Sequence, residues 1–148
     1  MFKCYRKVYW TTFVSATGKL MSANMDSSGS NATAVTEILS LYLTSLSGVA
    51  LDSSEERLYL TISDGSSYGI QSCDLDGGDL RLVLQLQEAA VGILIHNERI
   101  YWTTIRNEDG KLQSCTKEGT DIRTHYETSE KFRQLTIGQD TGDYRVAH

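Results

Sequence analysis

Short runs of β-branched, aromatic and other apolar residues alternate with polar turns along the whole chain. Such runs have the length and composition of β-strands. Glycine interrupts every candidate helical stripe before it has lasted three turns, so the pattern predicts an all-β fold. The predicted strands lie at residues 8–12, 58–62 and 100–104; 19–24, 70–74 and 112–116; 32–39, 80–86 and 122–126; and 46–52, 90–96 and 132–137.

The predicted strands recur with a fixed order. Tyr9, Tyr59 and Tyr101 are the second residues of equivalent strands, at intervals of 50 and 42 residues, and a serine in the following strand repeats with the same two intervals. Four strands in each unit of about 40–45 residues are typical of a β-propeller blade. We therefore read residues 1–148 as a single domain with repeats at about 7–56, 57–98 and 99–143, and the start of a further blade at 144–148.

The repeated strands carry a recognisable motif. Tyr-Trp-Thr-Thr stands at residues 9–12 and 101–104, and Leu-Tyr-Leu-Thr at 58–61 is a degenerate copy. Gly-Val-Ala-Leu-Asp at 48–52 and Asp-Leu-Asp-Gly at 74–77 add two further motifs. Together they resemble the class B repeats of the low-density lipoprotein receptor family, whose signature is Tyr-Trp-Thr-Asp. The structural repeat signature of this chain is Tyr9, Trp10, Tyr59, Tyr101 and Trp102.

The resemblance implies a six-bladed β-propeller with four-stranded antiparallel blades, as found on extracellular receptor and matrix proteins. The chain then holds the outer three strands of one blade, two complete blades and the opening of a fourth, which is about half of the ring. The signature aspartate is replaced by Thr12, Ile62 and Thr104. A polar link between blades through that aspartate is therefore not predicted.

Composition and charge narrow the classes of partner. The chain has 148 residues and a net charge of −5, which disfavours nucleic acid and anionic membranes as partners. No apolar run approaches the length of a membrane helix. The start of the chain lacks the apolar segment of a signal peptide. We expect no membrane contact by this segment; an extracellular or cell-surface location is implied only by the resemblance.

Residues with catalytic or metal-binding chemistry do not form a recognisable set. His96, His125 and His148 are far apart, and no Gly-x-Ser-x-Gly motif occurs. The acidic run at residues 74–79 superficially resembles a calcium loop, but Gln85 stands where an EF-hand needs glutamate. We read the run as a hairpin and predict no enzyme activity, no metal and no cofactor. The alternative is an enzyme of the metal-dependent lactonase type, which has a similar fold.

The predicted function is binding of a protein ligand by a module of an endocytic or signalling receptor. The contact is expected at the loops between second and third strands, at residues 13–17, 63–67 and 105–109. The mixed charges and the adjacent aromatic residue there suit a protein partner. The candidate partner-binding residues are Asp64, Tyr68, Arg106, Glu108 and Asp109. Asn31 begins an Asn-Ala-Thr sequon and is the candidate glycosylation site.

Two further expectations concern thiols and assembly. Cys73 and Cys115 occupy equivalent strand positions and are predicted to be free, buried thiols, and Cys4 has no partner in the repeat. Because a half ring leaves apolar blade faces open, we expect self-association or completion by further blades of a longer parent chain. A third interpretation is an incomplete gene product without independent activity.

Overall fold

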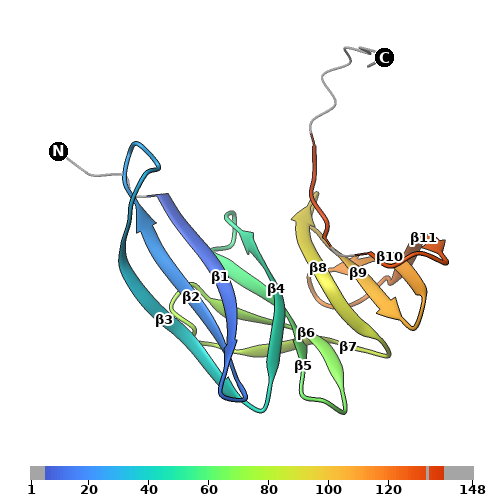
Figure 1. The fold of residues 1–148 in the computed structure, drawn as a ribbon. Coiled ribbons are helices and arrows are strands. Elements are labelled where there is room, and N and C mark those ends of the chain that lie inside the picture. The colour runs from blue at the N-terminus through green and yellow to red at the C-terminus, as the bar shows by residue number, and fades with distance from the viewer. Residues whose placement is uncertain (1–5, 133, 139–148) are drawn as a thin grey trace, which may run out of the picture.

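The computed structural model describes residues 6–132 and 134–138, and within them the fold consists of strands without helices (Figure 1). None of the described residues belongs to a helix long and apolar enough to cross a bilayer. The strands are β1 Arg6–Val14, β2 Thr17–Met25, β3 Ala32–Tyr42, β4 Ser45–Asp52, β5 Arg57–Ser63, β6 Tyr68–Asp74, β7 Arg81–Leu86, β8 Ala89–His96, β9 Arg99–Arg106, β10 Asp109–Thr116 and β11 Arg123–Thr128.

The strands form three antiparallel sheets, which we call blades 1, 2 and 3. Blade 1 has the order β1-β2-β3, blade 2 the order β4-β5-β6-β7, and blade 3 the order β8-β9-β10-β11. Blade 2 lies between the other two (Figure 1). This is the predicted partial propeller: the outer three strands of one blade followed by two complete four-stranded blades.

The core consists of apolar side chains that face each other between neighbouring blades. Between blades 2 and 3, Tyr59 and Ile70 pack with Ile100, Trp102 and Cys115, and all five are at most 2% exposed. Between blades 1 and 2, a second cluster comprises Leu20, Leu46, Leu58, Leu60 and Cys73. The prediction that Tyr59 and Trp102 serve core packing is confirmed, whereas Tyr9, Trp10 and Tyr101 are only half-buried.

Both described cysteines are free and buried, as predicted. Burial raises the pKa of the Cys73 thiol and raises that of Cys115 to about 11, so neither is a reactive thiolate at neutral pH. Cys4 lies outside the described residues.

Two turns that contain glycine pack blade 2 against blade 1 and blade 3 against blade 2. Gly77 and Gly119 have φ values of 86° and 80°, and they stand at equivalent places in blades 2 and 3. A Cβ atom on Gly77 would collide with the carbonyl oxygen of Ile38 in blade 1, and one on Gly119 with that of Val83 in blade 2. Both the left-handed conformation and the close approach of two backbones therefore require glycine.

An arginine in the second strand of each complete blade fixes the turn between the third and fourth strands. Arg57 donates to the Ser72 hydroxyl at 2.9 Å and to the Asp79 carboxylate at 3.0 Å. In blade 3 the equivalent contacts join Arg99 to Ser114 at 3.0 Å and to Asp121 at 2.9 Å. These bonds satisfy the buried serine hydroxyls and hold each blade as a unit.

The predicted strand at 132–137 is wrong: residues 132 and 134–138 form no strand. Inner strands of neighbouring blades pack without pairing, and none of the described strands of this chain lies beside the segment as a pairing partner. The segment nevertheless lies at the predicted place. A Cβ on Gly48 would lie 2.9 Å from the Val91 oxygen of the next inner strand, and one on Gly92 would lie 3.0 Å from the Leu135 nitrogen.

Trp102→Ala is expected to lower the free energy of unfolding by about 3–5 kcal/mol, because it empties a fully buried site between blades 2 and 3. Tyr59→Ala, across the same interface, is expected to be similarly severe. Urea unfolding followed by circular dichroism measures both. Losses below about 1 kcal/mol at both positions would show that the two blades do not pack in solution.

Gly119→Ala is expected to destabilise the fold more than Gly29→Ala. Both glycines have positive φ, 80° and 72°, so both variants carry the strain of a left-handed alanine, about 1–2 kcal/mol. Only Gly119 also faces the Val83 carbonyl, whereas nothing lies within 4 Å of a Cβ on Gly29. Thermal melts of the two variants compare them directly, and equal losses would contradict docking of the turn on blade 2.

Candidate functional site

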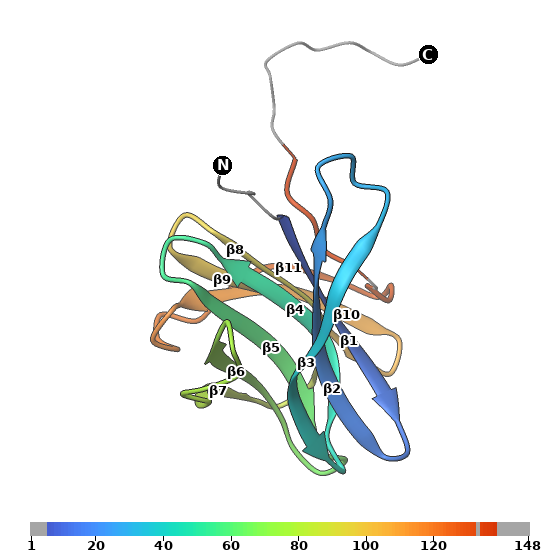
Figure 2. The ribbon, with the colours of Figure 1, turned by 90° about the vertical axis from the view of Figure 1, so that its left-hand side faces the viewer.

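The segments that connect the strands lie at the two ends of the strands, along two opposite edges of the molecule. The connections β1–β2, β3–β4, β5–β6, β7–β8 and β9–β10 lie along one edge, which we call the loop rim (Figure 2). The remaining connections lie along the opposite edge, which we call the turn rim. The loop rim contains the three loops predicted to contact a partner.

The loop rim of blade 1 carries exposed apolar side chains. The backbone N–H of Leu43 donates to the Ala16 oxygen at 2.7 Å, which joins the β3–β4 connection to the β1–β2 turn. Large apolar residues at this junction are 57–72% exposed: Phe13, Val14, Tyr42 and Leu43. We call these four residues the apolar patch. The loop predicted at residues 13–17 includes Phe13 and Val14, but the prediction missed Tyr42, which ends β3, and Leu43, which follows it in the connection to blade 2.

The loop rim of blade 2 is shaped by Asp64. Its carboxylate accepts the backbone N–H groups of Ser66 at 3.0 Å and Ser67 at 2.8 Å. These hydrogen bonds lower the pKa of Asp64 to about 2, so the group is ionised at neutral pH. Tyr68 begins β6 and is half-buried. The structure thus gives Asp64 a turn-forming role, and its predicted contact with a partner stays a prediction.

The loop rim of blade 3 gathers charges of both signs around Glu88. The Glu88 carboxylate accepts the Thr104 hydroxyl at 3.1 Å and lies 3.4 Å from the Lys111 ammonium and 3.7 Å from the Arg106 guanidinium. Only 12% of the Glu88 side chain is exposed, against 71% for Arg106. Glu88 was missed in the sequence because it lies in the single connection between blades 2 and 3 and has no counterpart in the repeat.

The remaining predicted residues of blade 3 lie beside this cluster. Glu108 is 82% exposed and forms an ion pair with Lys131 at 3.1 Å, and Asp109 begins β10. The structure therefore brings Arg106, Glu108 and Asp109 together on one loop. Asp64 and Tyr68 belong to the neighbouring blade of the same rim.

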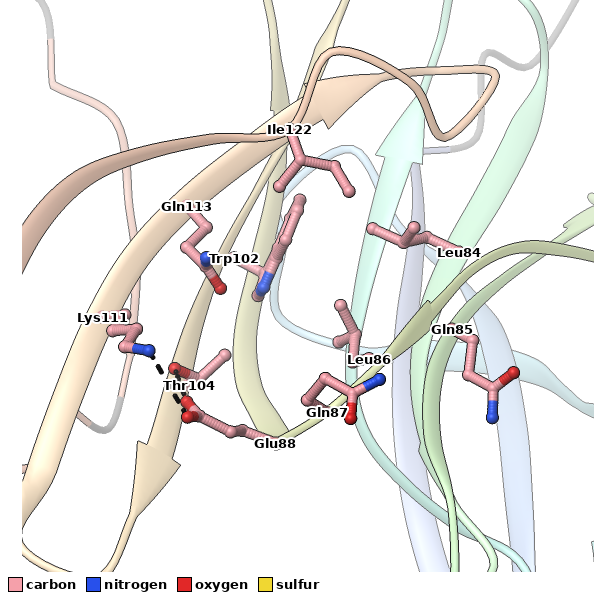
Figure 3. A pocket seen from close by; sticks show the side chains of 10 residues that line it. All are labelled: Leu84, Gln85, Leu86, Gln87, Glu88, Trp102, Thr104, Lys111, Gln113 and Ile122. Carbon is pink, nitrogen blue, oxygen red and sulfur yellow. Dashed lines mark hydrogen bonds and ion pairs between the residues drawn. The ribbon is translucent and has the colours of Figure 1, made fainter.

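A cavity of about 200 Å³ opens between blades 2 and 3 beside Glu88 (Figure 3). Trp102, Leu84, Leu86 and Ile122 supply its apolar lining, and Lys111 and Thr104 approach Glu88 at its polar end (Figure 3). The Trp102 ring nitrogen is buried and has no hydrogen-bond partner among the described residues. The cavity has room for a small side chain or for water.

The turn rim carries the most deeply buried charges of the described residues. The Lys117 ammonium, in the β10–β11 turn, lies 2.5 Å from the Asp52 carboxylate and 2.9 Å from that of Glu98. The side chains of Lys117 and Asp52 are 6% and 5% exposed. Burial alone would raise the pKa of Asp52, but the bonds to Lys117 and Ser54 outweigh it and lower the pKa. Blades 2 and 3 are thus joined by a buried ion pair.

Other candidate positions have structural roles on the turn rim. The acidic run at 74–79 is a hairpin turn, as predicted, in which the Gly77 N–H donates to the Asp74 oxygen at 3.0 Å. His96 ends the inner strand β8. No group of three His, Cys, Asp or Glu side chains in the described part of the chain is arranged to hold a metal. Asn31 is exposed in the β2–β3 turn and donates to Asp26 at 3.3 Å; its glycosylation stays a prediction.

Comparisons with known proteins support the fold. No family model matches the chain, and no curated protein matches it. A putative TolB from Agrobacterium tumefaciens is 12% identical, with a TM-score of 0.67, over 82% of this chain and 45% of that one. A puromycin hydrolase is also 12% identical, with a TM-score of 0.63, over 82% of this chain and 20% of that one. The chain thus spans less than half of either protein.

A chain of a nidogen/laminin complex is 14% identical, over 84% of this chain and 62% of that one, with a TM-score of 0.43. This likeness is too low to bear on the family. Similarities at such identities show the fold alone, and the fold is a partial β-propeller.

Lys117→Met is expected to lower the free energy of unfolding by about 3–5 kcal/mol at pH 7, because it leaves the Asp52 carboxylate buried without its cation. Lys131→Met is the matched control, since it removes an ion pair whose side chains are 47% and 82% exposed, and should cost less than about 1 kcal/mol. Urea unfolding measures both, and equal costs would contradict a buried pair.

The same pair should contribute to the pH dependence of stability. The pKa of Asp52 is lower in the folded chain than its ordinary value of 3.8. Its stabilising contribution is therefore complete above that ordinary value and is lost as the pH falls through the folded value. Between pH 6 and pH 2.5, Lys117→Met should lose less stability than the parent chain. A loss as large as that of the parent would contradict this assignment.

Proposed function

We propose that this chain forms part of a non-catalytic, protein-binding propeller module of the kind carried by extracellular receptors of the low-density lipoprotein receptor type. The observation that carries the proposal is the apolar patch on the loop rim. Four large apolar side chains, each more than half exposed, lie where the β1–β2 turn meets the β3–β4 connection. Large apolar side chains exposed near one another on a protein surface are typical of sites of protein interaction.

The charged loop of blade 3 supports the same assignment. Interfaces between proteins combine an apolar centre with a polar rim. Arg106, Glu108 and Asp109 supply exposed groups of both signs on the edge that also carries the apolar patch. A protein partner that spans the loop rim would meet apolar side chains on blade 1 and charged side chains on blade 3. The mixed charge favours a protein over a polyanion.

The position of Asn31 agrees with an extracellular module. Asn31 lies in the β2–β3 turn of the turn rim, at the end of β2 opposite the apolar patch. A glycan on Asn31 would therefore leave the loop rim free for a partner. We propose Asn31 as the glycosylation site of the secreted or cell-surface protein.

The loop-rim assignment predicts a protein contact that depends on position. A photoreactive benzoylphenylalanine replaces Tyr42, and a second variant carries it at Leu80, which is 40% exposed on the turn rim. After irradiation in conditioned culture medium, Tyr42 is expected to crosslink a defined extracellular protein that Leu80 does not. Phe13→Ser in the Tyr42 variant should reduce the adduct several-fold. Equal adducts at the two positions, or none at Tyr42, would contradict the proposal.

The alternative function is that of an enzyme of the metal-dependent lactonase type. Titration of the purified chain with calcium, manganese and zinc distinguishes it from the proposed function. Tight stoichiometric binding measured by calorimetry would favour the enzyme and count against the proposed function. Asp52, which ends an inner strand, is paired with Lys117, so we expect no such binding through this carboxylate.

A further inference from the structure

The outer face of blade 1 has the sequence of a blade–blade interface but no blade covers it in the described structure. Val8 is equivalent in the repeat to Leu58 and Ile100. These two are fully buried by the preceding blade, whereas Val8 is 40% exposed. Trp10 is equivalent to the fully buried Trp102 and is only half-buried. The same positions are therefore apolar in all three blades, whether covered or not.

The outer face of blade 3 shows the complementary half. Tyr101 and Leu112 are equivalent to Tyr59 and Ile70. Tyr59 and Ile70 are 2% and 0% exposed where blade 3 covers them, but Tyr101 and Leu112 are half-buried. A cavity of about 210 Å³ on this face is lined by Leu94, His96, Tyr101, Leu112 and residues 135–137. Tyr101 is held in place by stacking on His125, with ring centroids 5.5 Å apart.

Each of these two outer faces has the residues of one side of a blade–blade interface. The chain contains two complete interfaces of this kind, between blades 1 and 2 and between blades 2 and 3. Blade 1 presents its tyrosine-bearing face to blade 2, and blade 2 presents the same kind of face to blade 3. The face left over on blade 3 therefore matches the face left over on blade 1. We infer that two copies of this chain associate head to tail, with blade 3 of each copy packed on blade 1 of the other.

The segment that follows blade 3 adds a second contact to this arrangement. Leu135 lies against Gly92 as Val91 lies against Gly48, so residues 134–138 occupy the place of the next inner strand. In the described residues, blade 1 has no inner strand, and β1 is a free sheet edge. Residues 134–138 of one copy can therefore pair with β1 of the other. A strand added to a free edge satisfies backbone groups on both sides.

The charges on the outer face of blade 1 permit this burial. Cross-strand pairing places Lys19 and Glu37 on the same face as Trp10, and their side chains form an ion pair at 2.7 Å. The pair is internally neutral, so covering it leaves neither charge without a partner. Arg6 shares this face, but it is the first residue of β1 and is exposed at the turn rim, where its charge can stay in contact with solvent. The two contacts of a head-to-tail pair are identical, and together they make a closed dimer. In this dimer the β1 edge and the outer faces of blades 1 and 3 are all covered.

Sedimentation equilibrium of the purified 148-residue chain tests the inference. At micromolar concentration we expect a particle of twice the 16.5 kDa chain mass that does not grow further with concentration. A monomer would overturn the inference, and so would open-ended polymers, because both exclude a closed pair.

Two variants that each block one face identify the contact. Val8→Glu blocks blade 1 and His125→Glu blocks blade 3, and each residue is exposed in the single chain, so folding should persist, as circular dichroism will verify. Each variant alone should be monomeric at concentrations at which the parent is dimeric. An equimolar mixture should recover part of the dimer, because it retains one intact contact. No recovery, or dimers of either variant alone, would overturn the head-to-tail arrangement.

A control variant separates this inference from the proposed function. Leu43→Glu changes a 59% exposed residue of the apolar patch that belongs to neither outer face. It should reduce the crosslink from Tyr42 but leave the dimer unchanged. Loss of the dimer in Leu43→Glu to the same degree as in Val8→Glu would show that association occurs through the loop rim, and would overturn the inference.

Discussion

The structure depends on the packing of each sheet face against the next sheet. A single blade has two apolar faces and cannot bury either alone, so its stability comes from its neighbours. In blade 2 both faces are covered, and Leu58, Leu60 and Ile70 are completely buried. The equivalent side chains on the outer faces of blades 1 and 3 remain partly exposed. The residue types at these equivalent positions hardly change from blade to blade. How deeply each side chain is buried therefore depends on whether a neighbouring blade covers its face.

The repeat made much of the fold predictable. The recurring Tyr and Trp positions predicted which strands pack between blades, and Tyr59 and Trp102 are buried as that pattern requires. Arg57 and Arg99, which bind the turns of their blades, are spaced by the same period of 42 residues, although neither belongs to the Tyr-Trp-Thr motif. The strand predicted at 132–137 is absent, because a periodic pattern gives the propensity of a segment but does not supply the neighbouring strand with which it must pair.

The candidate site was less predictable because its main residues fall outside the repeat. Glu88 lies in the connection between blades 2 and 3, and Lys117 replaces a residue that is leucine in blade 2, Leu75. Their partners come from other elements: Thr104 and Lys111 for Glu88, and Asp52 and Glu98 for Lys117. No spacing in the sequence shows that these groups meet. The apolar patch was predicted in part, because Phe13 and Val14 belong to the predicted loop at 13–17, whereas Tyr42 ends β3 and Leu43 follows it in a connection between blades.

The polar side-chain contacts between blades 2 and 3 differ from those between blades 1 and 2. Blades 2 and 3 are joined on the turn rim by the ion pair between Asp52 and Lys117. Glu88 directly precedes β8, and its contacts with Thr104 and Lys111 lie within blade 3. Between blades 1 and 2, no side-chain hydrogen bond or ion pair is found among residues 6–132 and 134–138.

Apolar packing and the docking of Gly77 therefore hold blade 1 in place. Apolar contacts are non-directional, whereas the ion pair between Asp52 and Lys117 fixes two particular groups of blades 2 and 3 against each other. The apolar patch therefore lies on the blade that is held to its neighbour by packing, and the charged loop lies on the blade that is also held by a buried ion pair.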